Sequence, residues 1–242
     1  MKIHGTAKGG ALSKRDFGVA FGGGGNGGFD KSDIIAYYNF DNDTGALINE
    51  ATSENGFDDG SSSTNNGTNG SGVTLDVTGI IDKAYDYDAT SNGYTDCGDD
   101  IISGTGDYSF NVWLYHDLES GNDAGLLGGT NQELVTYQAA TDKYLGGASP
   151  KVATTSTIDV NVWHMLSYTR SGTTGKVYLD GEEENTNTNS TNIVSGSWHI
   201  GGVSGGGENW HGRIDELCIA ERAFTADEIT ELYNDGDGLS LL

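Results

Sequence analysis

The sequence is poor in several features that would direct it toward particular folds and functions. Its 242 residues include one proline and two cysteines, and no run of 18 apolar residues occurs. Without such a run the sequence predicts no membrane-spanning helix. Cys97 and Cys218 match no CxxC metal or redox motif. The two thiols can pair in an oxidising compartment or remain separate and buried, and the sequence does not decide between these states.

Basic residues are also scarce. The chain has 12 Lys and Arg and 36 Asp and Glu, so its net charge is −24. A chain this acidic repels nucleic acids and anionic membrane surfaces, so neither is expected as a partner. The charge is unevenly distributed. Residues 1–30 hold four Lys or Arg and two Asp, a net charge of +2, and the remaining residues therefore carry −26.

Residues 1–30 differ from the rest in composition and form a predicted N-terminal arm. They are basic and rich in glycine, and Phe17 and Phe21 bound their main apolar cluster, next to Lys14 and Arg15. Alone, such a segment cannot bury enough apolar surface to offset the entropy lost on ordering. Two interpretations stay open: a passive leader, or an arm that docks the chain into a multi-subunit assembly through these four side chains.

Residues 31–242 are predicted to form one domain of short β-strands. Apolar and polar residues alternate in segments bounded by Gly, Asn and Asp, which favours an all-β antiparallel sandwich. Strands are predicted over Asp33–Phe40, Lys83–Asp88, Tyr108–Tyr115, Val162–Arg170, Lys176–Leu179, Ser197–Gly201 and Gly212–Glu221. Asp180 and Gly181 form a strong two-residue hairpin signal. Residues 61–72 and 185–192 are predicted to be surface loops.

One short helix is expected near the C-terminus. Thr225 and Glu228 have the spacing of a capping box, an apolar stripe includes Ile229 and Leu232, and Asn234–Gly236 ends it. Because two to three turns are too short for independent stability, this helix must pack on the sandwich.

Several segments together resemble a known family. They are Ala36–Asp41 (AYYNFD), Tyr108–Tyr115 (YSFNVWLY), Trp163–Arg170 (WHMLSYTR), Gly175–Gly181 (GKVYLDG) and Trp210–Ile219 (WHGRIDELCI). Their order and spacing over residues 33–235 resemble the laminin-G-like, concanavalin-A-like lectin/glucanase domains related to pentraxins. The resemblance implies a jelly-roll sandwich and does not include the arm. It leaves function open, because this fold carries lectins, adhesion modules, hydrolases and structural spacers.

No catalytic motif is convincing. Glycosidases of this fold often carry Glu-x-Asp-x-Glu on one strand, and that pattern is absent here. Asp86 and Asp88 share a strand face but stand where a strand meets a loop. Residues 202–206 (GVSGG) match a nucleophile elbow, yet no helix follows them. The sequence therefore predicts a protein that is not an enzyme.

Calcium is the cation that the loops favour, because hard cations bind several carboxylate and carbonyl oxygens. Asp41 and Asp43 lie just after the first strand. In the family that the chain resembles, a cation often ties this loop to the Asp of the last long strand, here Asp215. The resemblance thus implies a structural calcium at these three residues. The alternative is an Asx turn at Asp41 and an Asp215 that anchors a loop through hydrogen bonds.

Sugar binding would require exposed aromatic rings. Trp113, Trp163 and Trp210 fall on strand positions where a core role is expected. Trp198, close in sequence to a glycine-rich loop, and Tyr144, in a variable connection, are the candidate ligand-binding residues.

Together these observations favour a non-catalytic recognition or adhesion module that binds a glycan or a protein. Its arm would anchor it in a larger, oligomeric assembly, with an extracellular or virion-surface location. No secretory signal is visible at the start. The alternatives are a purely structural decoration or filament subunit and, third, a glycoside hydrolase with an unusual site.

Overall fold

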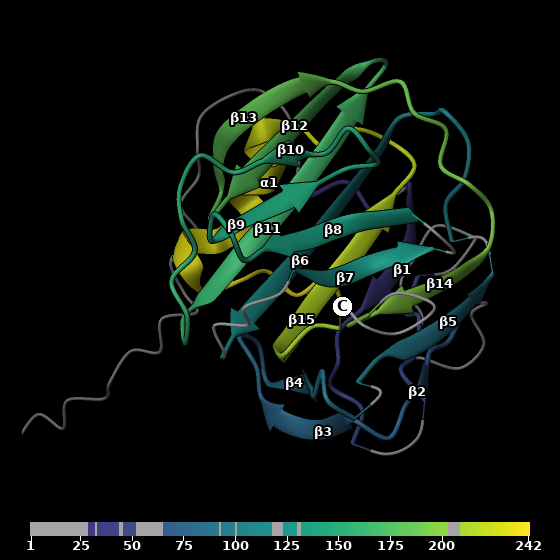
Figure 1. Cartoon of the computed structure of the whole chain (residues 1–242), viewed down its shortest axis with the longest axis vertical. Coiled ribbons are helices and arrows are strands. Elements are labelled where there is room, and N and C mark those ends of the chain that lie inside the picture. The colour runs from purple at the N-terminus through teal and green to yellow at the C-terminus, as the bar shows by residue number, and fades with distance from the viewer. Residues whose placement is uncertain are drawn as a thin grey trace, which may run out of the picture.

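The computed structural model describes residues 29–31, 33–43, 46–51, 65–91, 93–99, 101–117, 123–129, 132–202 and 209–242. Within them, two antiparallel sheets pack face to face, and one α-helix lies on the outside (Figure 1). This arrangement confirms the predicted all-β sandwich with a short C-terminal helix. Of the predicted arm, only Phe29 and Asp30 are among the described residues.

The first sheet has the strand order β13-β12-β11-β6-β15-β4-β3, and β1 also pairs with β15. Its strands are β1 (Ile34–Tyr38), β3 (Val73–Thr78), β4 (Lys83–Tyr87), β6 (Tyr108–His116), β11 (Trp163–Ser171), β12 (Thr174–Leu179), β13 (Glu182–Thr188) and β15 (Gly212–Ala220). All seven predicted strands are present: six lie in this sheet and the seventh, β14, lies in the other.

The second sheet has the strand order β10-β9-β8-β7-β14-β5-β2. Its strands are β2 (Thr68–Asn69), β5 (Thr95–Asp99), β7 (Ala124–Gly129), β8 (Gln132–Gln138), β9 (Lys143–Gly146), β10 (Val152–Ala153) and β14 (Ser197–Ile200). Most of this sheet was not predicted, because strands such as β7 (AGLLGG) are short and rich in glycine, which has low β-propensity.

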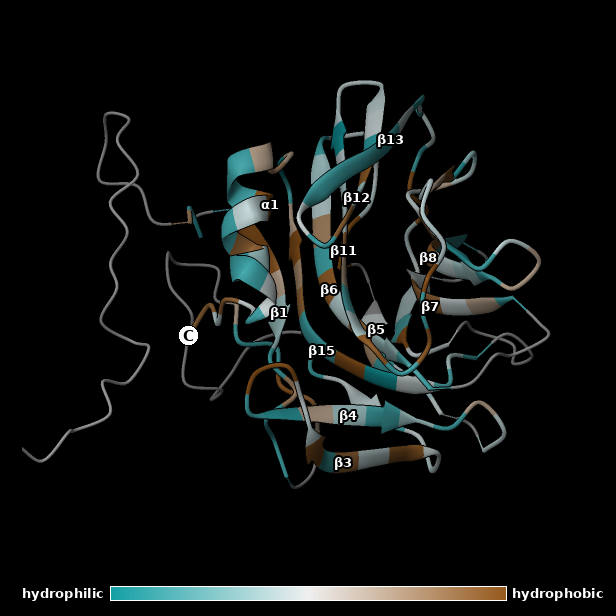
Figure 2. Ribbon diagram, turned by 90° about the vertical axis from the view of Figure 1, so that its left-hand side faces the viewer, coloured by the Kyte–Doolittle hydropathy of each residue, from teal (hydrophilic) through white to brown (hydrophobic). Residues whose placement is uncertain are grey.

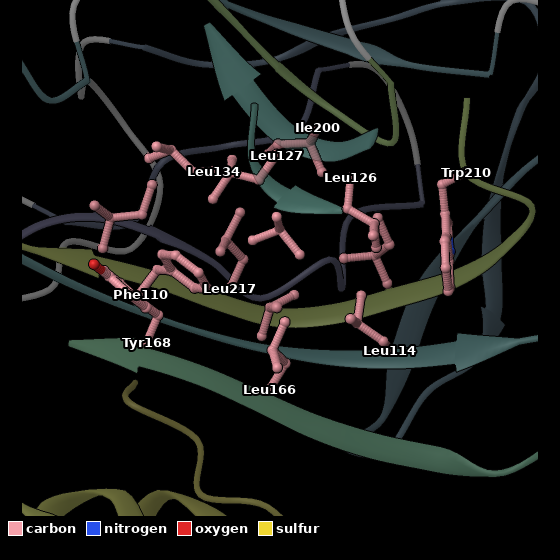
Figure 3. Packing of buried hydrophobic residues seen from close by; sticks show 14 of the residues in the cluster. Phe110, Leu114, Leu126, Leu127, Leu134, Leu166, Tyr168, Ile200, Trp210 and Leu217 are labelled. Carbon is pink, nitrogen blue, oxygen red and sulfur yellow. The ribbon is translucent and has the colours of Figure 1, made fainter. Parts of the chain in front are cut away.

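The main core fills the space between the sheets. Alternate side chains of β6 and β11 point into it and meet leucines of β7 and β8 (Figure 3). The labelled members are Phe110, Leu114, Leu126, Leu127, Leu134, Leu166, Tyr168, Ile200, Trp210 and Leu217. Each is at most 2% exposed, so truncating one of the leucines to alanine should cost about 2–5 kcal/mol of stability.

A second apolar cluster lies on the opposite face of the first sheet, beneath helix α1 (Ala226–Tyr233) (Figure 2). Trp113 of β6 points to this face, and its ring stacks on Tyr233 with centroids 5.6 Å apart. The capping box is confirmed, because the Thr225 hydroxyl accepts from the Glu228 N–H and the Glu228 carboxylate accepts from the Thr225 N–H. The C-cap of the helix is Asn234, whose backbone has the left-handed conformation. The short 3-10 turn η2 (Asn234–Gly236) follows.

The hairpin between β12 and β13 is also confirmed. Asp180 and Gly181 have φ values of 51° and 86°, the left-handed conformation that a tight two-residue turn requires. The predicted loop over residues 185–192 is partly wrong, because Asn185–Thr188 belongs to β13. Its side chains are mostly exposed, so no apolar alternation marks this edge strand, and its backbone pairing with β12 holds it.

Both cysteines are buried and free. Cys97 lies in the main core and Cys218 in the cluster under the helix. Burial raises the pKa of Cys97 to about 12, so its thiol stays protonated and unreactive at neutral pH.

Candidate functional site

A pocket of about 240 Å³ lies where three central strands of the first sheet begin or end. There β11 ends at Ser171, β15 ends at Ala220 and β6 begins at Tyr108. We call it the Arg170 pocket; its lining residues are Ile102, Ser103, Gly106, Asp107, Arg170, Ile193 and Glu221. Because loops meet at strand ends, such a position combines a rigid base with variable walls.

Arg170 is the most buried charged residue of this pocket, at 1% exposed. It pairs with Tyr108 in the β11–β6 ladder, and its guanidinium carbon lies 4.6 Å from the centroid of that ring. Its Nη1 donates to the Thr191 carbonyl at 2.6 Å, and its Nη2 and Nε donate to the Gly106 carbonyl at 2.5 and 3.1 Å. Among the described residues, no carboxylate forms an ion pair with Arg170. Carbonyl dipoles and the ring face therefore compensate its charge.

The walls and the rim of the pocket differ in polarity. Ile102 and Ile193 are buried, and backbone hydrogen bonds of 2.9 and 2.8 Å between Gly104 and Ile193 join the two segments that carry them. Asp107 and Glu221 are exposed, as is the nearby Ser103. Because the two isoleucines are buried, the groups that the pocket exposes are mainly polar and can form hydrogen bonds.

Two contacts fix the carboxylate-bearing residues of the rim. The Asp107 Oδ1 atom accepts a hydrogen bond from the Gly172 N–H at 2.7 Å. The backbone N–H of Glu221 donates to the Asp33 carbonyl at 3.0 Å.

Sequence analysis missed this pocket because its residues come from four separate segments. The one available signal was Arg170, a charged residue within a predicted strand.

The predicted ligand-binding aromatics lie elsewhere. Trp198 and Tyr144 are 1% and 0% exposed, so neither ring presents a face on which a sugar can stack. Trp198 points inward because Ile200, two residues along the same strand, also faces the core. Tyr144 lies in that core as well, with its ring centroid 6.2 Å from that of Trp210. A nearby glycine-rich loop suggested exposure of Trp198, and a variable connection suggested exposure of Tyr144, but both rings lie on the core side of their strands.

The predicted calcium ligands are engaged in hydrogen bonds. The Asp215 Oδ2 atom accepts from the N–H groups of Ile80 and Ile81 at 2.9 and 3.1 Å, and the Asp41 Oδ1 atom accepts from the Lys83 N–H at 3.0 Å. This geometry matches the alternative in which Asp215 anchors a loop. Across the part of the chain that the structure describes, no three His, Cys, Asp or Glu are grouped to hold a metal.

The same carboxylates still interact through charge. Burial, followed by the charge of Glu216 and, more weakly, that of Asp41, raises the pKa of Asp215. Burial also raises the pKa of Asp41. Asp43, the third predicted ligand, is exposed. Burial therefore disfavours the ionised forms of Asp41 and Asp215.

Asp86 and Asp88 have opposite environments. Burial, followed by the charge of Asp117, raises the pKa of Asp86. The Asp88 Oδ1 atom accepts hydrogen bonds from the hydroxyl and N–H of Thr90 at 2.7 and 2.8 Å, which lower the pKa of Asp88. Asp88 therefore closes a turn after β4.

Phe29 and Asp30 pack against the C-terminal part of the chain. Phe29 is 8% exposed, its ring packs edge-on against Phe224 with centroids 5.3 Å apart, and its N–H donates to Glu231. Arg222 donates to the carbonyl of Asp30 at 2.6 Å. The predicted arm residues Lys14, Arg15, Phe17 and Phe21 lie outside the described residues. Phe29 and Asp30, assigned to the arm from sequence, are thus held by the body.

Comparison with known proteins identifies one family. A family model described as the concanavalin A-like lectin/glucanases superfamily matches residues 88–230, which is more than half of the chain. A search of curated protein sequences finds no match. In the described part of the chain, no helix has the length and apolar character needed to cross a bilayer.

Solved structures with the same fold include one sugar-bound domain. Domain 4 of AbnA, an extracellular arabinanase from Geobacillus stearothermophilus, is similar to this chain with a TM-score of 0.58 and 22% identity; it was solved with arabinotriose. The match covers 82% of this chain and 97% of that domain. The match to the binding domain of Paraclostridial Mosquitocidal Protein 1 has a TM-score of 0.65 and 16% identity. It covers 84% of this chain and 52% of the other.

A third similar structure is an enzyme. Trypanosoma rangeli sialidase matches with a TM-score of 0.53 and 14% identity, over 88% of this chain and 34% of the sialidase. The chain thus spans about a third of that enzyme. At these identities the likeness establishes the fold that the structures share.

Proposed function

Because the chain belongs to the concanavalin A-like lectin/glucanases superfamily, we propose that it is a non-catalytic carbohydrate-binding module. The Arg170 pocket carries this proposal. Its exposed Ser103, Asp107 and Glu221 can form hydrogen bonds with the hydroxyl groups of a sugar. The sugar-bound arabinanase domain, which has the same fold, supports it as an analogy.

The proposal that the chain is not catalytic depends on the carboxylate pair that glycoside hydrolysis requires. Retaining hydrolysis needs two carboxyl groups about 5–5.5 Å apart, and inverting hydrolysis needs them about 6.5–9.5 Å apart, on either side of the bond to be cleaved. In the candidate pair Asp86 and Asp88, the Asp88 carboxylate already accepts two hydrogen bonds from Thr90 in the turn after β4. A hydrolase is therefore the weaker candidate.

We place the module on a surface outside the cell or on a virion, held in an assembly by residues 1–28. Calcium at Asp41, Asp43 and Asp215 is part of the same proposal. Its support is that burial is the main cause that raises the pKa of both Asp41 and Asp215, and a bound cation would offset the cost of burying their ionised forms.

A glycan array tests the proposed function. The purified full chain, labelled on its lysines, is applied to neutral and acidic oligosaccharides with and without calcium. We expect saturable binding to a restricted set of glycans. In parallel, release of reducing ends from each bound glycan is measured over a day. Absence of binding to any glycan would contradict the proposal, and catalytic release would contradict its non-catalytic part.

A further inference from the structure

We propose that the Arg170 pocket receives the uncharged terminal sugar of a neutral glycan and discriminates against acidic sugars. This inference rests on the proposed function and adds the site and the class of sugar. Its support is the way in which the cation and the carboxylates of the pocket are arranged.

The Arg170 guanidinium is not free to clamp an anion. Strong recognition of a carboxylate by arginine uses two parallel N–H groups. Here all three guanidinium nitrogens already donate to the carbonyls of Gly106 and Thr191, and one face of the group lies over Tyr108. A sialic acid or uronic acid entering the pocket would have to compete with these bonds.

Negative charge exceeds positive charge at the rim of the pocket. Asp107 and Glu221 are both exposed at the mouth, whereas Arg170 is the one cation among the lining residues that the structure describes, so these residues have a net charge of −1. The whole chain carries −24. An acidic sugar is therefore repelled on approach, while sugar hydroxyl groups can donate charge-assisted hydrogen bonds to the two carboxylates.

The size of the pocket favours one end of a glycan. Its volume of about 240 Å³ is below the roughly 300–1,000 Å³ of sites that enclose drug-sized ligands. A single terminal ring with adjacent hydroxyl groups fits this volume better than an extended chain does.

The experiment compares matched charge variants of the full chain. Asp107→Asn with Glu221→Gln removes both rim charges, and the new amide at position 107 keeps an acceptor oxygen for the Gly172 N–H, so folding is preserved. The control is Asp159→Asn with Glu182→Gln, the same change at two exposed residues. The N–H of Asn161 donates to the carbonyl of His116, the last residue of β6, which places Asp159 at the opposite end of that strand from the pocket.

Binding is measured on neutral oligosaccharides, each beside its acidic counterpart, with arabinotriose and the pair lactose and sialyllactose among them. The best neutral glycan is then titrated by calorimetry. We expect the neutral member of each pair to bind more tightly. The rim variant should bind it at least tenfold more weakly than the control, with an unchanged melting temperature.

The outcomes separate the two proposals. Neutral-glycan binding that is equal in the rim variant and the control would place the site elsewhere and leave the proposed function intact. Preference for the acidic member of the pairs would overturn the inference about sugar class. No binding to any glycan would remove the proposed function itself.

Discussion

The hydroxyl of Tyr37 donates a hydrogen bond to the Oε2 atom of Glu216, and both side chains are buried. The same hydroxyl accepts from the N–H of Leu241 at 3.1 Å, so the contact also holds the C-terminal tail. Glu216 has φ 49° and lies at the irregularity of the β15–β6 pairing between Asp215 and Cys218. The extra residue lets both Ile214 and Leu217 face the main core.

Glu216 should make stability depend on pH. Burial is the main cause that raises its pKa from 4.5 to about 8. Between these values the folded state holds a proton that the unfolded state releases, so the free energy of unfolding falls as pH rises. The loss should approach about 5 kcal/mol by pH 8. Urea denaturation from pH 5 to 9 measures it.

Glu216→Gln isolates this contribution. Glutamine can still accept from Tyr37 and does not titrate, so the variant should lose the corresponding slope and exceed the native protein in stability at pH 8. Glu182→Gln, at an exposed position, is the control and should keep the native slope. Parallel pH profiles for Glu216→Gln and the native protein would contradict the prediction.

The calcium proposal predicts a chelator-sensitive melting temperature. A ligand at a hundredfold excess over its Kd stabilises the folded state by about 2.7 kcal/mol. Excess chelator should remove that stabilisation, and Asp43→Asn should abolish the response without disturbing the fold, because Asp43 is exposed. Differential scanning calorimetry with and without calcium measures the change. An identical melt in chelator and in calcium would eliminate this site.

The arm prediction compares two truncations. Deleting residues 1–28 should leave the melting temperature unchanged and prevent assembly, measured by sedimentation. Deleting residues 1–30 should also cost about 2 kcal/mol, because it removes the buried ring of Phe29. Salt should weaken assembly only partly, since apolar contacts are not screened. If the shorter truncation assembles like the full chain, the arm is a passive leader.

Glu184 should fasten the edges of the two sheets together. Its carboxylate accepts from both N–H groups of Thr155 and Ser156, at 2.8 and 3.0 Å, and from both hydroxyls. Burial opposes its charge, but these bonds outweigh burial and lower its pKa to about 2. The stabilisation is complete above pH 4.5 and is lost as pH falls toward 2.

Glu184→Ala should therefore cost about 1 kcal/mol at neutral pH. It should also speed hydrogen exchange at the amides of Thr155 and Ser156, which NMR can follow. The neighbouring Glu183→Ala is the control, since Glu183 pairs with Lys176 on the exposed surface instead. Unchanged exchange at the two amides would show that the carboxylate does not hold them.

The sequence predicted those parts of the fold that depend on local signals. The turn at Asp180 and Gly181 and the cap at Thr225 are set by neighbouring residues, so both could be read directly. Trp198 could not be placed, because its burial depends on which face of an unpredicted sheet it joins. The Arg170 pocket depends on four segments meeting in space, which no spacing along the chain reports.

The edge strand β13 has a consequence for solution behaviour. It begins with three consecutive glutamates, Glu182 to Glu184, and lies at the end of the strand order of the first sheet. An edge backbone can pair with the same edge of another molecule and start aggregation, unless like charges keep the two apart. The protein should therefore remain dispersed, and replacing Glu182 and Glu183 with glutamine should make it prone to edge-to-edge association.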